Sequence, residues 1–472
     1  MLPVNCGSHA DYQNLVVENL RKYYPNPDLL ARSTWDIIER FWHLDLSDTD
    51  TLLTHKYSKF GPAPRTPSCM QRSYLLSIDF KVSSITEWAA QLKMNPLFAI
   101  LSGFQVGDTP GVGTFYDFMK RLWDSDEPHM TSHIHPLKAK VKKPDAKGEK
   151  AASVEKVTVA ELLPQLEKTA FPLNDQPYAS LFKIYQKEFL DVSVEKGLIH
   201  KDSLALAGDG TPVVTSHRER KKRICKCKEN GINDCSCDRY FSQPDCDIGW
   251  DSSRDCFYHG YDLYMLVDSQ SDLPVFPHYS YASKHDSHGF LQAFFRMRAF
   301  LPDYKVSKVL LDSAHDAMPY YQYFKRQNIT PFIDLNGKGG RPPVYKNDFT
   351  IDKDGVPVCP SGHRMRRDGI EVAKGRMKFK CPKISHTGGC ISCTCDKPCS
   401  KAKYGRTVHL ILNDNPRLFN NPPRSSKEWK LEYNARTSAE RSNKREKLDF
   451  KLEDGRHRST KMWYCRLYHI LM

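Results

Sequence analysis

The residues Leu204-Ala-Leu-Ala-Gly-Asp-Gly-Thr211 set the fold class that we predict for the second half of the chain. Four apolar residues are typical of a buried strand, and they run directly into Gly208-Asp209-Gly210-Thr211. From here to position 333, segments with the pattern of strands alternate with segments with the pattern of helices. Such a succession predicts a mixed α/β sheet.

The other elements of the predicted sheet follow in order along the chain. Asp268 to Asp272 form the turn of a predicted hairpin, and an uninterrupted apolar strand ends at Asp312. The predicted strands are 261–267, 273–277, 306–311 and 329–333, and the predicted helices are 289–300 and 318–326. No internal repeat is evident.

The composition is that of a folded, basic protein. The 472 residues include 70 Lys plus Arg against 56 Asp plus Glu, a formal net charge of +14. At about 150 residues per domain, this length predicts about three units. The mean hydropathy is −0.59 and the sequence pI is about 9.0. Without a run of about 18 apolar residues, the sequence excludes a membrane-spanning protein.

The positive charge favours a polyanionic partner, most simply nucleic acid, although a basic enzyme with a solvated surface has the same balance. Met1 to Asp11 lacks a charged region followed by an apolar stretch, so we expect no secretory signal.

The first part of the chain is rich in Trp, Leu and Phe and is predicted to be mostly helical. Ser84-Ile-Thr-Glu87 is a capping box that opens one helix, and Thr114-Phe-Tyr-Asp117 opens another. The two helices could belong to a helix-turn-helix DNA reader or to an ordinary helical packing domain. The long connection between them leaves both interpretations open.

A lysine-rich segment from Pro136 to Val157 has no apolar period, which predicts a flexible basic linker that is either solvated or in contact with phosphates. A helix is expected next, around Tyr178 to Gly197. We therefore expect a helical N-terminal DNA-binding domain at 1–135, a linker and helix at 136–200, and an α/β domain at 201–472.

Two acids lie where sheets of this type usually place their chemistry. Asp209 and Asp312 each end an apolar strand, and such strand ends open into a cleft. For either acid alone, a turn or helix-capping residue is the commoner explanation. His315 and Asp316 follow Asp312 closely and could support it, although capping of the next helix is the simpler role for both.

A third acid comes from Tyr433-Asn-Ala-Arg-Thr-Ser-Ala-Glu-Arg-Ser-Asn-Lys-Arg-Glu-Lys447, which is helical by propensity. At 100° per residue, Tyr433, Arg436, Glu440 and Lys447 fall within about 60° of arc. A solvated helix with i, i+4 ion pairs would also explain the charges. Such a helix has no need to place its tyrosine on the charged face, so a functional face is favoured.

Three carboxylates on a sheet and a facing helix could hold two Mg²⁺ ions, because hard cations take oxygen ligands. Two such ions about 4 Å apart stabilise the attacking and leaving oxygens of an in-line phosphoryl displacement. Arg436 and Lys447 could then neutralise phosphates of a bound strand. The pattern therefore indicates phosphoryl transfer on a nucleic acid.

The same segment resembles the signature of DDE transposases of bacterial insertion sequences, in the branch that carries Tyr-Arg-Glu-Lys. In that signature Tyr, two residues, Arg, three residues, Glu, six residues and Lys follow in order. Tyr433, Arg436, Glu440 and Lys447 match it at every interval. Four residues and three gaps must all agree, which makes the signature specific.

The two Asp blocks of the family have counterparts as well. Gly-Asp209-Gly-Thr resembles the first block, and Leu-Leu-Asp312-Ser-Ala-His-Asp resembles the second. The resemblance implies a mixed-sheet, ribonuclease-H-like catalytic domain with a Cys-rich insertion at about 336–423, before the catalytic helix. It covers the chain from Lys201 to Lys447, and the N-terminal part is similar only in its order of helices.

The resemblance also implies roles. Asp209, Asp312 and Glu440 would be the catalytic residues and would bind two Mg²⁺ or Mn²⁺ ions, with Asp334 as the main competitor for the third acid. An activated water would cut a strand at the transposon end, and the freed 3′-hydroxyl would attack target DNA.

Tyr433, Arg436 and Lys447 would bind DNA at the transposon-end backbone. The partners implied are transposon ends and target DNA, with a homodimer assembled on DNA and no membrane. The location implied is the bacterial cytoplasm, in association with the nucleoid.

Fifteen cysteines without an export signal favour metal ligation over disulfides. Two Cys-x-Cys pairs form one cluster, and Cys359-Pro-Ser-Gly-His363 in the insertion resembles a zinc-ribbon knuckle. Reduced, unliganded thiols are the alternative, and the choice of four ligands in the insertion is open. The candidate ligands for structural Zn²⁺ are Cys225, Cys227, Cys235, Cys237, Cys359, Cys381, Cys390 and Cys393.

The sequence therefore predicts a cut-and-paste DNA transposase. Two alternatives remain: a zinc-dependent DNA-binding protein without enzymatic activity, such as a domesticated transposase, and a nuclease of the same core that hydrolyses DNA without strand transfer.

Overall fold

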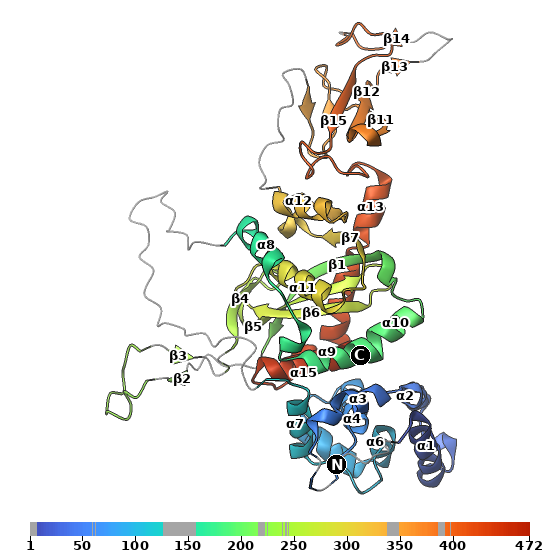
Figure 1. Cartoon of the computed structure of the whole chain (residues 1–472), viewed down its shortest axis with the longest axis vertical. Helices are drawn as coiled ribbons and strands as arrows, with labels where there is room; N and C mark the ends of the chain where they lie inside the picture. Colours follow the sequence, from blue (N-terminus) through green and yellow to red (C-terminus); the bar gives the residue numbers. More distant parts are fainter. Residues whose placement is uncertain are drawn as a thin grey trace.

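The structure is a computed structural model, and its elements lie in three parts along one long axis (Figure 1). A helical region forms one end, a sheet with its helices forms the middle, and a second β region forms the other end. The described residues are 7–58, 60–61, 63–125, 157–215, 222–223, 225–237, 239–240, 243, 245–337, 349–385, 392–396 and 398–472. Most of the predicted linker and Cys390 lie outside them.

The N-terminal region is helical, as predicted. Ser84 caps one helix by accepting a hydrogen bond from the Glu87 backbone N–H. The second predicted helix begins at Val112 with Gly111 as its N-cap, so Thr114 does not open it. The helices are α1 (His9–Tyr23), α2 (Arg32–His43), α3 (Ser47–Leu53), α4 (Pro67–Asp79), α5 (Ile85–Met94), α6 (Pro96–Ser102) and α7 (Val112–Arg121). The predicted connection between α5 and α7 thus contains a buried helix, α6.

A second group of helices lies between this region and the sheet. The predicted helix around 178–197 is confirmed as α9 (Ala179–Tyr185), a π-helical segment η4 (Gln186–Asp191) and α10 (Val192–Glu195). The preceding helix α8 (Val159–Lys168) does not belong to this group and packs against α11 (Asp286–Phe300) and α12 (Met318–Arg326). The C-terminal helix α15 (Thr460–Leu471) packs against α4 and α9 (Figure 1). Tyr178 stacks on Tyr464 of α15, with ring centroids 4.8 Å apart. Buried aromatic contacts therefore join the N-terminal helices to the sheet.

The central sheet is mixed, as predicted. Its strands are β1 (Leu204–Val214), β4 (Asp247–Asp251), β5 (Cys256–Asp268), β6 (Pro274–Tyr281), β7 (Val306–Leu311) and β8 (Thr330–Ile333), in the order β4-β5-β1-β7-β8 with β6 also paired to β5. The β5 strand is antiparallel to β1 and β6, whereas β1, β7 and β8 are parallel. Pairing is therefore antiparallel on the β4 and β5 side of β1 and parallel on the β7 and β8 side.

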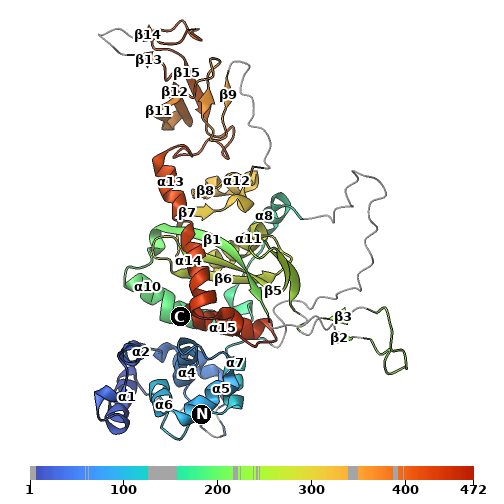
Figure 2. The ribbon, with the colours of Figure 1, turned by 180° about the vertical axis from the view of Figure 1, so that it is seen from behind.

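Helices cover both faces of β1. Successive side chains of a strand point to opposite faces, so neighbouring residues of β1 contact different helices. Asp209 and Thr211 contact side chains of the C-terminal helical segment. A side chain at Gly208 or Gly210 would instead meet Tyr264 or Asp286, the first residue of α11 (Asp286–Phe300). Figure 1 shows α11 in front of the sheet, and Figure 2, from behind, shows α14 (Thr437–Lys444) there.

The helix predicted at 433–447 is not continuous. It forms α13 (Lys427–Asn434), α14 and a π-helical segment η9 (Arg445–Asp449). At the junction, the backbone N–H groups of Arg436 and Ser438 bond to carbonyls three residues back. The Thr437 hydroxyl donates to the Asn434 carbonyl, which competes with the helical ladder. Tyr433 and Glu440 therefore lie on two helices.

The predicted Cys-rich insertion is a separate β region between β8 and α13. A three-stranded antiparallel sheet has the order β11 (Arg366–Glu371), β12 (Arg376–Lys380), β15 (Thr407–Ile411). Two short pairs accompany it: β9 (Thr350–Ile351) with β10 (Pro357–Val358), and β13 (Ile384–Ser385) with β14 (Ser392–Cys393). Its apolar core, which includes Ile351, Met377 and Leu410, is distinct from the main core.

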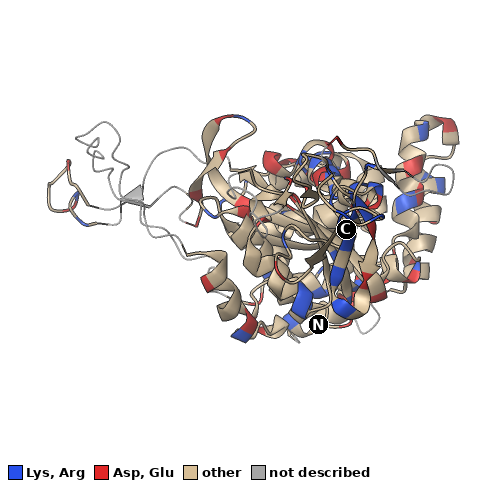
Figure 3. Cartoon of the chain, turned by 90° about the horizontal axis from the view of Figure 1, so that it is seen from above, with Lys and Arg blue, Asp and Glu red and all other residues tan. Residues whose placement is uncertain are grey.

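Charged residues are spread over most elements. In the view along the long axis, Lys and Arg alternate with Asp and Glu along the helices (Figure 3). Across the described ranges, we found no helix that combines the length and the apolar character needed to cross a membrane.

Candidate active site

The prediction that Asp209 ends its strand is wrong: Asp209 lies in the middle of β1, because Gly208 and Gly210 on either side of it continue the pairing with β5. Its side chain faces α14. Its Oδ2 accepts a hydrogen bond of 3.2 Å from Asn443 Nδ2. Burial raises the pKa of Asp209 to about 7, and the charges of Asp286, Asp312 and Glu440 act in the same direction, whereas Arg436 opposes them. These carboxylates are therefore close enough for their charges to interact.

Asp312 follows the last residue of β7 and is held by a buried histidine. His315 Nδ1 lies 2.7 Å from Asp312 Oδ1, and His315 Nε2 lies 2.9 Å from the hydroxyl of Tyr264. Burial favours protonation of Asp312, but the hydrogen bond and charge of His315 outweigh it and lower the pKa of Asp312. His315 therefore supports Asp312. The simpler predicted role, capping of the next helix, is wrong for His315, because α12 has no side-chain cap.

Glu440 lies on α14 and is paired with Arg436. Arg436 Nη2 is 2.6 Å from Glu440 Oε1, and the side chain of Glu440 is 50% exposed whereas that of Arg436 is 17% exposed. The Arg436 guanidinium also interacts with the charges of Asp209 and Asp312 and lies 5.8 Å from the centre of the Tyr433 ring. Arg436 is thus the cation common to all three acids.

The Lys447 side chain points toward β1 and not toward Arg436 and Glu440. Lys447 lies in the π-helical segment η9, which follows α14. Its ammonium donates a 2.7 Å hydrogen bond to the carbonyl of Pro212 on β1 and lies 3.2 Å from Glu453 Oε1. Glu453 Oε1 also accepts the backbone N–H of Val214. Lys447 therefore lies beside β1, apart from the group formed by Tyr433, Arg436 and Glu440.

Two further acids, which sequence reasoning missed, lie behind Asp209. A Cβ at Gly210 would lie 2.5 Å from Asp286 Oδ1 and 3.4 Å from Asp262 Oδ1, so both carboxylates pack against the glycine next to Asp209. Burial and the charge of Asp286 raise the pKa of Asp262 well above its ordinary value. Burial likewise raises the pKa of Asp286. Asp262 could have been identified from the sequence, because it is a charged residue within the apolar strand predicted at 261–267.

The acid cluster has a chemical character that suits divalent cations. Closely spaced carboxylates repel each other, and a hard cation with oxygen ligands relieves this repulsion. Asn443 adds an oxygen that a cation could bind. Its Oδ1 is buried, and no described residue donates a hydrogen bond to it. Carboxylate and amide oxygens are ligands that Mg²⁺ or Mn²⁺ accepts, so binding by Asp209, Asp312 and Glu440 stays a prediction. Among the described residues, the only group of three or more His, Cys, Asp or Glu ligand atoms within 4.8 Å of one another is the cysteine cluster described below.

The raised pKa of Asp209 predicts an unusual pH dependence of stability in metal-free protein. With a pKa of about 7 in the fold and 3.8 as its ordinary value, folded Asp209 keeps a proton between about pH 4 and 7 that the unfolded chain has released. The free energy of unfolding therefore falls as the pH rises through this window. We expect Asp209→Asn to remove this loss and to be more stable than the wild type at pH 8.

Urea unfolding with EDTA at pH 5 and pH 8 measures the effect. Asp202→Asn is the control, because this carboxylate is 77% exposed beside Lys305 and should leave the pH dependence unchanged. Equal pH dependence in the wild type and in Asp209→Asn would contradict the prediction.

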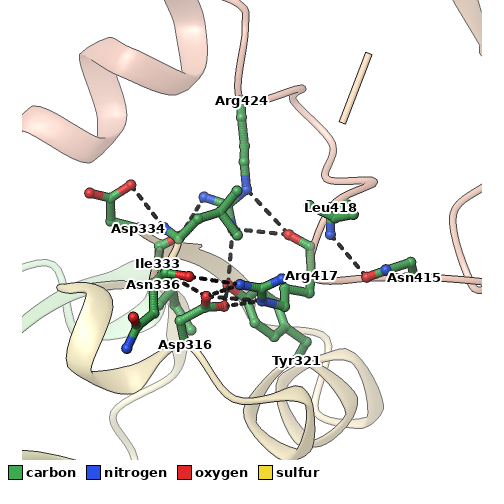
Figure 4. A network of polar contacts seen from close by, with 10 residues as sticks. Asp316, Tyr321, Ile333, Asp334, Asn336, Asn415, Arg417, Leu418 and Arg424 are labelled. Carbon is green, nitrogen blue, oxygen red and sulfur yellow. Dashed lines mark hydrogen bonds and ion pairs between the residues drawn. The ribbon is translucent and has the colours of Figure 1, made fainter. Parts of the chain in front are cut away.

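Asp316 belongs to a polar network that joins the loop after Asp312 to the insertion (Figure 4). Its side chain is fully buried, and Arg417 Nη2 lies 2.5 Å from Asp316 Oδ2. Asp316 also accepts the backbone N–H of Asn336 and the hydroxyl of Tyr321. Asp316 therefore holds the base of the insertion, and helix capping is not its role.

Arg424, which lies between β15 and α13 like Arg417, completes the network. Its guanidinium donates to the carbonyls of Ile333 and Arg417 and to the hydroxyl of Tyr321. Asp334, the competitor for the third acid, is exposed, and its Oδ1 accepts the backbone N–H of Leu335.

The two Cys-x-Cys pairs between β1 and β4 come together. The Sγ atoms of Cys225 and Cys235 are 3.5 Å apart, and those of Cys227 and Cys237 are 3.6 Å apart. All four sulfur atoms lie within 4.8 Å of one another. Tetrahedral zinc with Zn–S bonds of about 2.3 Å requires sulfur atoms about 3.8 Å apart. The cluster could therefore hold a zinc ion.

The local backbone and the thiol chemistry support such a site. Gly231 has a φ of +76°, a conformation that favours glycine, at the turn between the two pairs. Hydrogen bonds from the Cys227 backbone and the Cys235 thiol lower the pKa of Cys225 to about 7. The short strands β2 (Lys222–Arg223) and β3 (Arg239–Tyr240) flank the cluster.

The cysteines of the insertion are only partly accounted for. Cys359 and Cys381 are buried, and burial together with their charges raises the pKa of Cys399. Cys399, which belongs to the same cysteine group of the insertion, is thus a neighbour of both. Cys390 and the side chain of Cys393 lie outside the described residues. Zinc binding in the insertion stays a prediction.

Comparisons with known proteins give only distant likenesses, all of them to solved structures. No protein-family model and no curated protein matches the chain. Among solved structures, the chain is similar to a cryo-EM structure of a piggyBac transposase synaptic complex with hairpin DNA. The two share 10% sequence identity and a TM-score of 0.28, over 96% of this chain and 79% of that chain. At this distance the likeness does not assign the chain to a family.

Proposed function

We propose that the chain is a DNA transposase that cuts strands at transposon ends and transfers them to target DNA. The observation that carries the proposal is the gathering of acidic charge around Asp209, with Asp312 and Glu440 both interacting with Arg436. These are the acids that the resemblance to DDE transposases indicates. Their elements are far apart in sequence, so only folding brings them together.

Each residue has a proposed task. Asp209, Asp312 and Glu440 hold two divalent cations, and His315 keeps Asp312 ionised and oriented. A bound pair of Mg²⁺ ions supplies stabilisation of the attacking and leaving oxygens of an in-line displacement. Arg436 lies where it can neutralise a phosphate of the strand being cut.

The remaining signature residues are proposed to bind DNA. Tyr433 stacks on Trp429 at a centroid distance of 4.8 Å, which fixes its ring beside Arg436. Lys447 is already held by Pro212 and Glu453, so a DNA phosphate would compete with Glu453 for its ammonium. Because two ends must be cut and joined together, we propose that two copies of the chain assemble on DNA.

The experiment that tests this function uses full-length protein, Mg²⁺ and DNA carrying the two ends of the element, with a supercoiled plasmid as target. A denaturing gel separates cleaved ends from products joined to the target. We expect both. Cleavage without joining would favour the nuclease alternative, and the absence of cleavage would reject the enzyme.

A non-enzymatic, zinc-dependent DNA-binding protein is the second candidate, and the Cys225, Cys227, Cys235 and Cys237 cluster favours it. Zinc-loaded protein of this kind would bind DNA equally well with and without added Mg²⁺, and would show no cleavage. It would also tolerate neutral replacements of Asp209 and Asp312.

We further propose that this cluster binds structural zinc, which gives a direct prediction. Cys225→Ser should lower the zinc content by one ion per chain, because it removes one of four thiolate ligands. Elemental analysis of the purified protein measures the change. Cys256→Ser, an exposed cysteine outside the cluster, is the matched control. Equal zinc content in the wild type and Cys225→Ser would show that these thiols are unliganded.

A further inference from the structure

Asn443 is the most buried polar group of α14 that touches the acid cluster. The residue is 6% exposed, and its Nδ2 donates to Asp209 Oδ2. Its Oδ1 is buried, and no described residue donates a hydrogen bond to it. One half of the amide is therefore used, and the other half is an acceptor without a donor.

An unsatisfied amide oxygen is costly. Leaving a buried acceptor unpaired is unfavourable, and most buried polar groups in folded proteins are paired. Asn443 lies against a carboxylate that already interacts with Asp286, Asp312 and Glu440. A cation, or a water bound to one, would satisfy this oxygen and offset the negative charge beside it.

The position of Asn443 on its helix supports this interpretation. Residues three apart on a helix lie on one face, so Glu440 and Asn443 lie on the same side of α14. Asp209 faces them from β1. Hard divalent cations accept both carboxylate and amide oxygens.

An amide also suits the charge balance of the site. The cluster already contains Asp209, Asp312 and Glu440, with Asp262 and Asp286 behind them. A further carboxylate would increase repulsion in the metal-free protein, whereas an amide adds an oxygen ligand without adding charge.

We propose that Asn443 is a further ligand residue of the divalent-cation site, which binds the cation through its side-chain oxygen, directly or through a bound water. The proposal rests on the proposed function, because it assumes a cation at Asp209. The proposed cation site then has one neutral ligand residue, Asn443, in addition to its three acids.

The test measures Mn²⁺ binding, separately from activity, by isothermal titration calorimetry on full-length protein loaded with zinc. Asn443→Ala removes the oxygen and should weaken Mn²⁺ binding about 10-fold or more. Asn443→Asp keeps an oxygen in the same place and should bind Mn²⁺ at least as tightly as the wild type. Asn434→Ala, an exposed asparagine at the end of α13, is the matched control and should bind like the wild type.

The two variants separate a ligand from a merely structural donor. If Asn443 served only to donate to Asp209, Asn443→Asp would be the more damaging change, because an ionised carboxylate has no proton to donate. Weaker binding by Asn443→Asp than by Asn443→Ala would therefore overturn the proposal. Circular dichroism of the metal-free variants checks that both are folded.

The proposal and the proposed function fail in different ways. Wild-type protein that binds no Mn²⁺ beyond its zinc site would overturn both. Wild-type protein that binds Mn²⁺ with the same affinity as Asn443→Ala would overturn the role of Asn443 and leave the proposed function standing.

Discussion

Replacing Glu440 with Gln should reduce Mg²⁺-dependent strand cleavage at least about 10³-fold, because the loss of a carboxylate that holds the cations removes several kcal/mol of transition-state stabilisation. The fold should change little. The Glu440 side chain is half exposed, and its pair with Arg436 has i, i+4 spacing, so breaking it costs only about 0.3–0.5 kcal/mol. Cleavage rates of wild type and variant on the same DNA give the measurement.

Glu428→Gln is the matched control, since Glu428 is an exposed glutamate on α13 and should cut DNA at the wild-type rate. Equal cleavage by wild type and Glu440→Gln would contradict the assignment of the third acid. Asp334→Asn would then test the competitor.

Arg417→Ala should destabilise the protein by about 3–5 kcal/mol, because it leaves Asp316 buried without its cation. Arg417 contacts both carboxylate oxygens of Asp316 and also the carbonyl of Asn336. Urea unfolding of the full-length chain measures the loss. The double variant Asp316→Asn with Arg417→Ala no longer has a buried carboxylate without its cation. It should therefore recover part of the free energy of unfolding that Arg417→Ala loses.

An exposed ion pair of the same insertion provides the control. Arg364 contacts Asp352 and Asp354, and its side chain is 47% exposed. Arg364→Ala should cost at most about 1 kcal/mol, because such pairs are solvated and screened. Similar losses for the two arginines would contradict a special role for the Asp316 network.

The elements that could be predicted from the sequence are those with local signals. The strand at Val306–Leu311 and the helix at Met318–Arg326 are confirmed at both ends. Continuous apolar residues and a proline at the helix start identify them without reference to the rest of the chain. The hairpin of β5 and β6 is confirmed for the same reason.

Elements and contacts that depend on distant neighbours could not be predicted. The β4 strand is a polar segment that becomes a strand by pairing with β5. Asp286 precedes the predicted start of its helix, and only the fold brings it to Gly210. Asp316 is 101 positions from Arg417. The roles of Asp209, Asp312 and Glu440 stay predictions, although the fold brings their charges together.

The insertion lies in the chain between β8 and α13, and this order has a consequence for protein synthesis. A ribosome completes Asp209 and Asp312 first and reaches Glu440 only 128 residues after Asp312. At about 5–20 residues per second, the delay is roughly 6–25 s. During this interval the nascent chain holds two of the three proposed acids. On the proposed mechanism, it therefore leaves the host DNA uncut until the insertion has emerged.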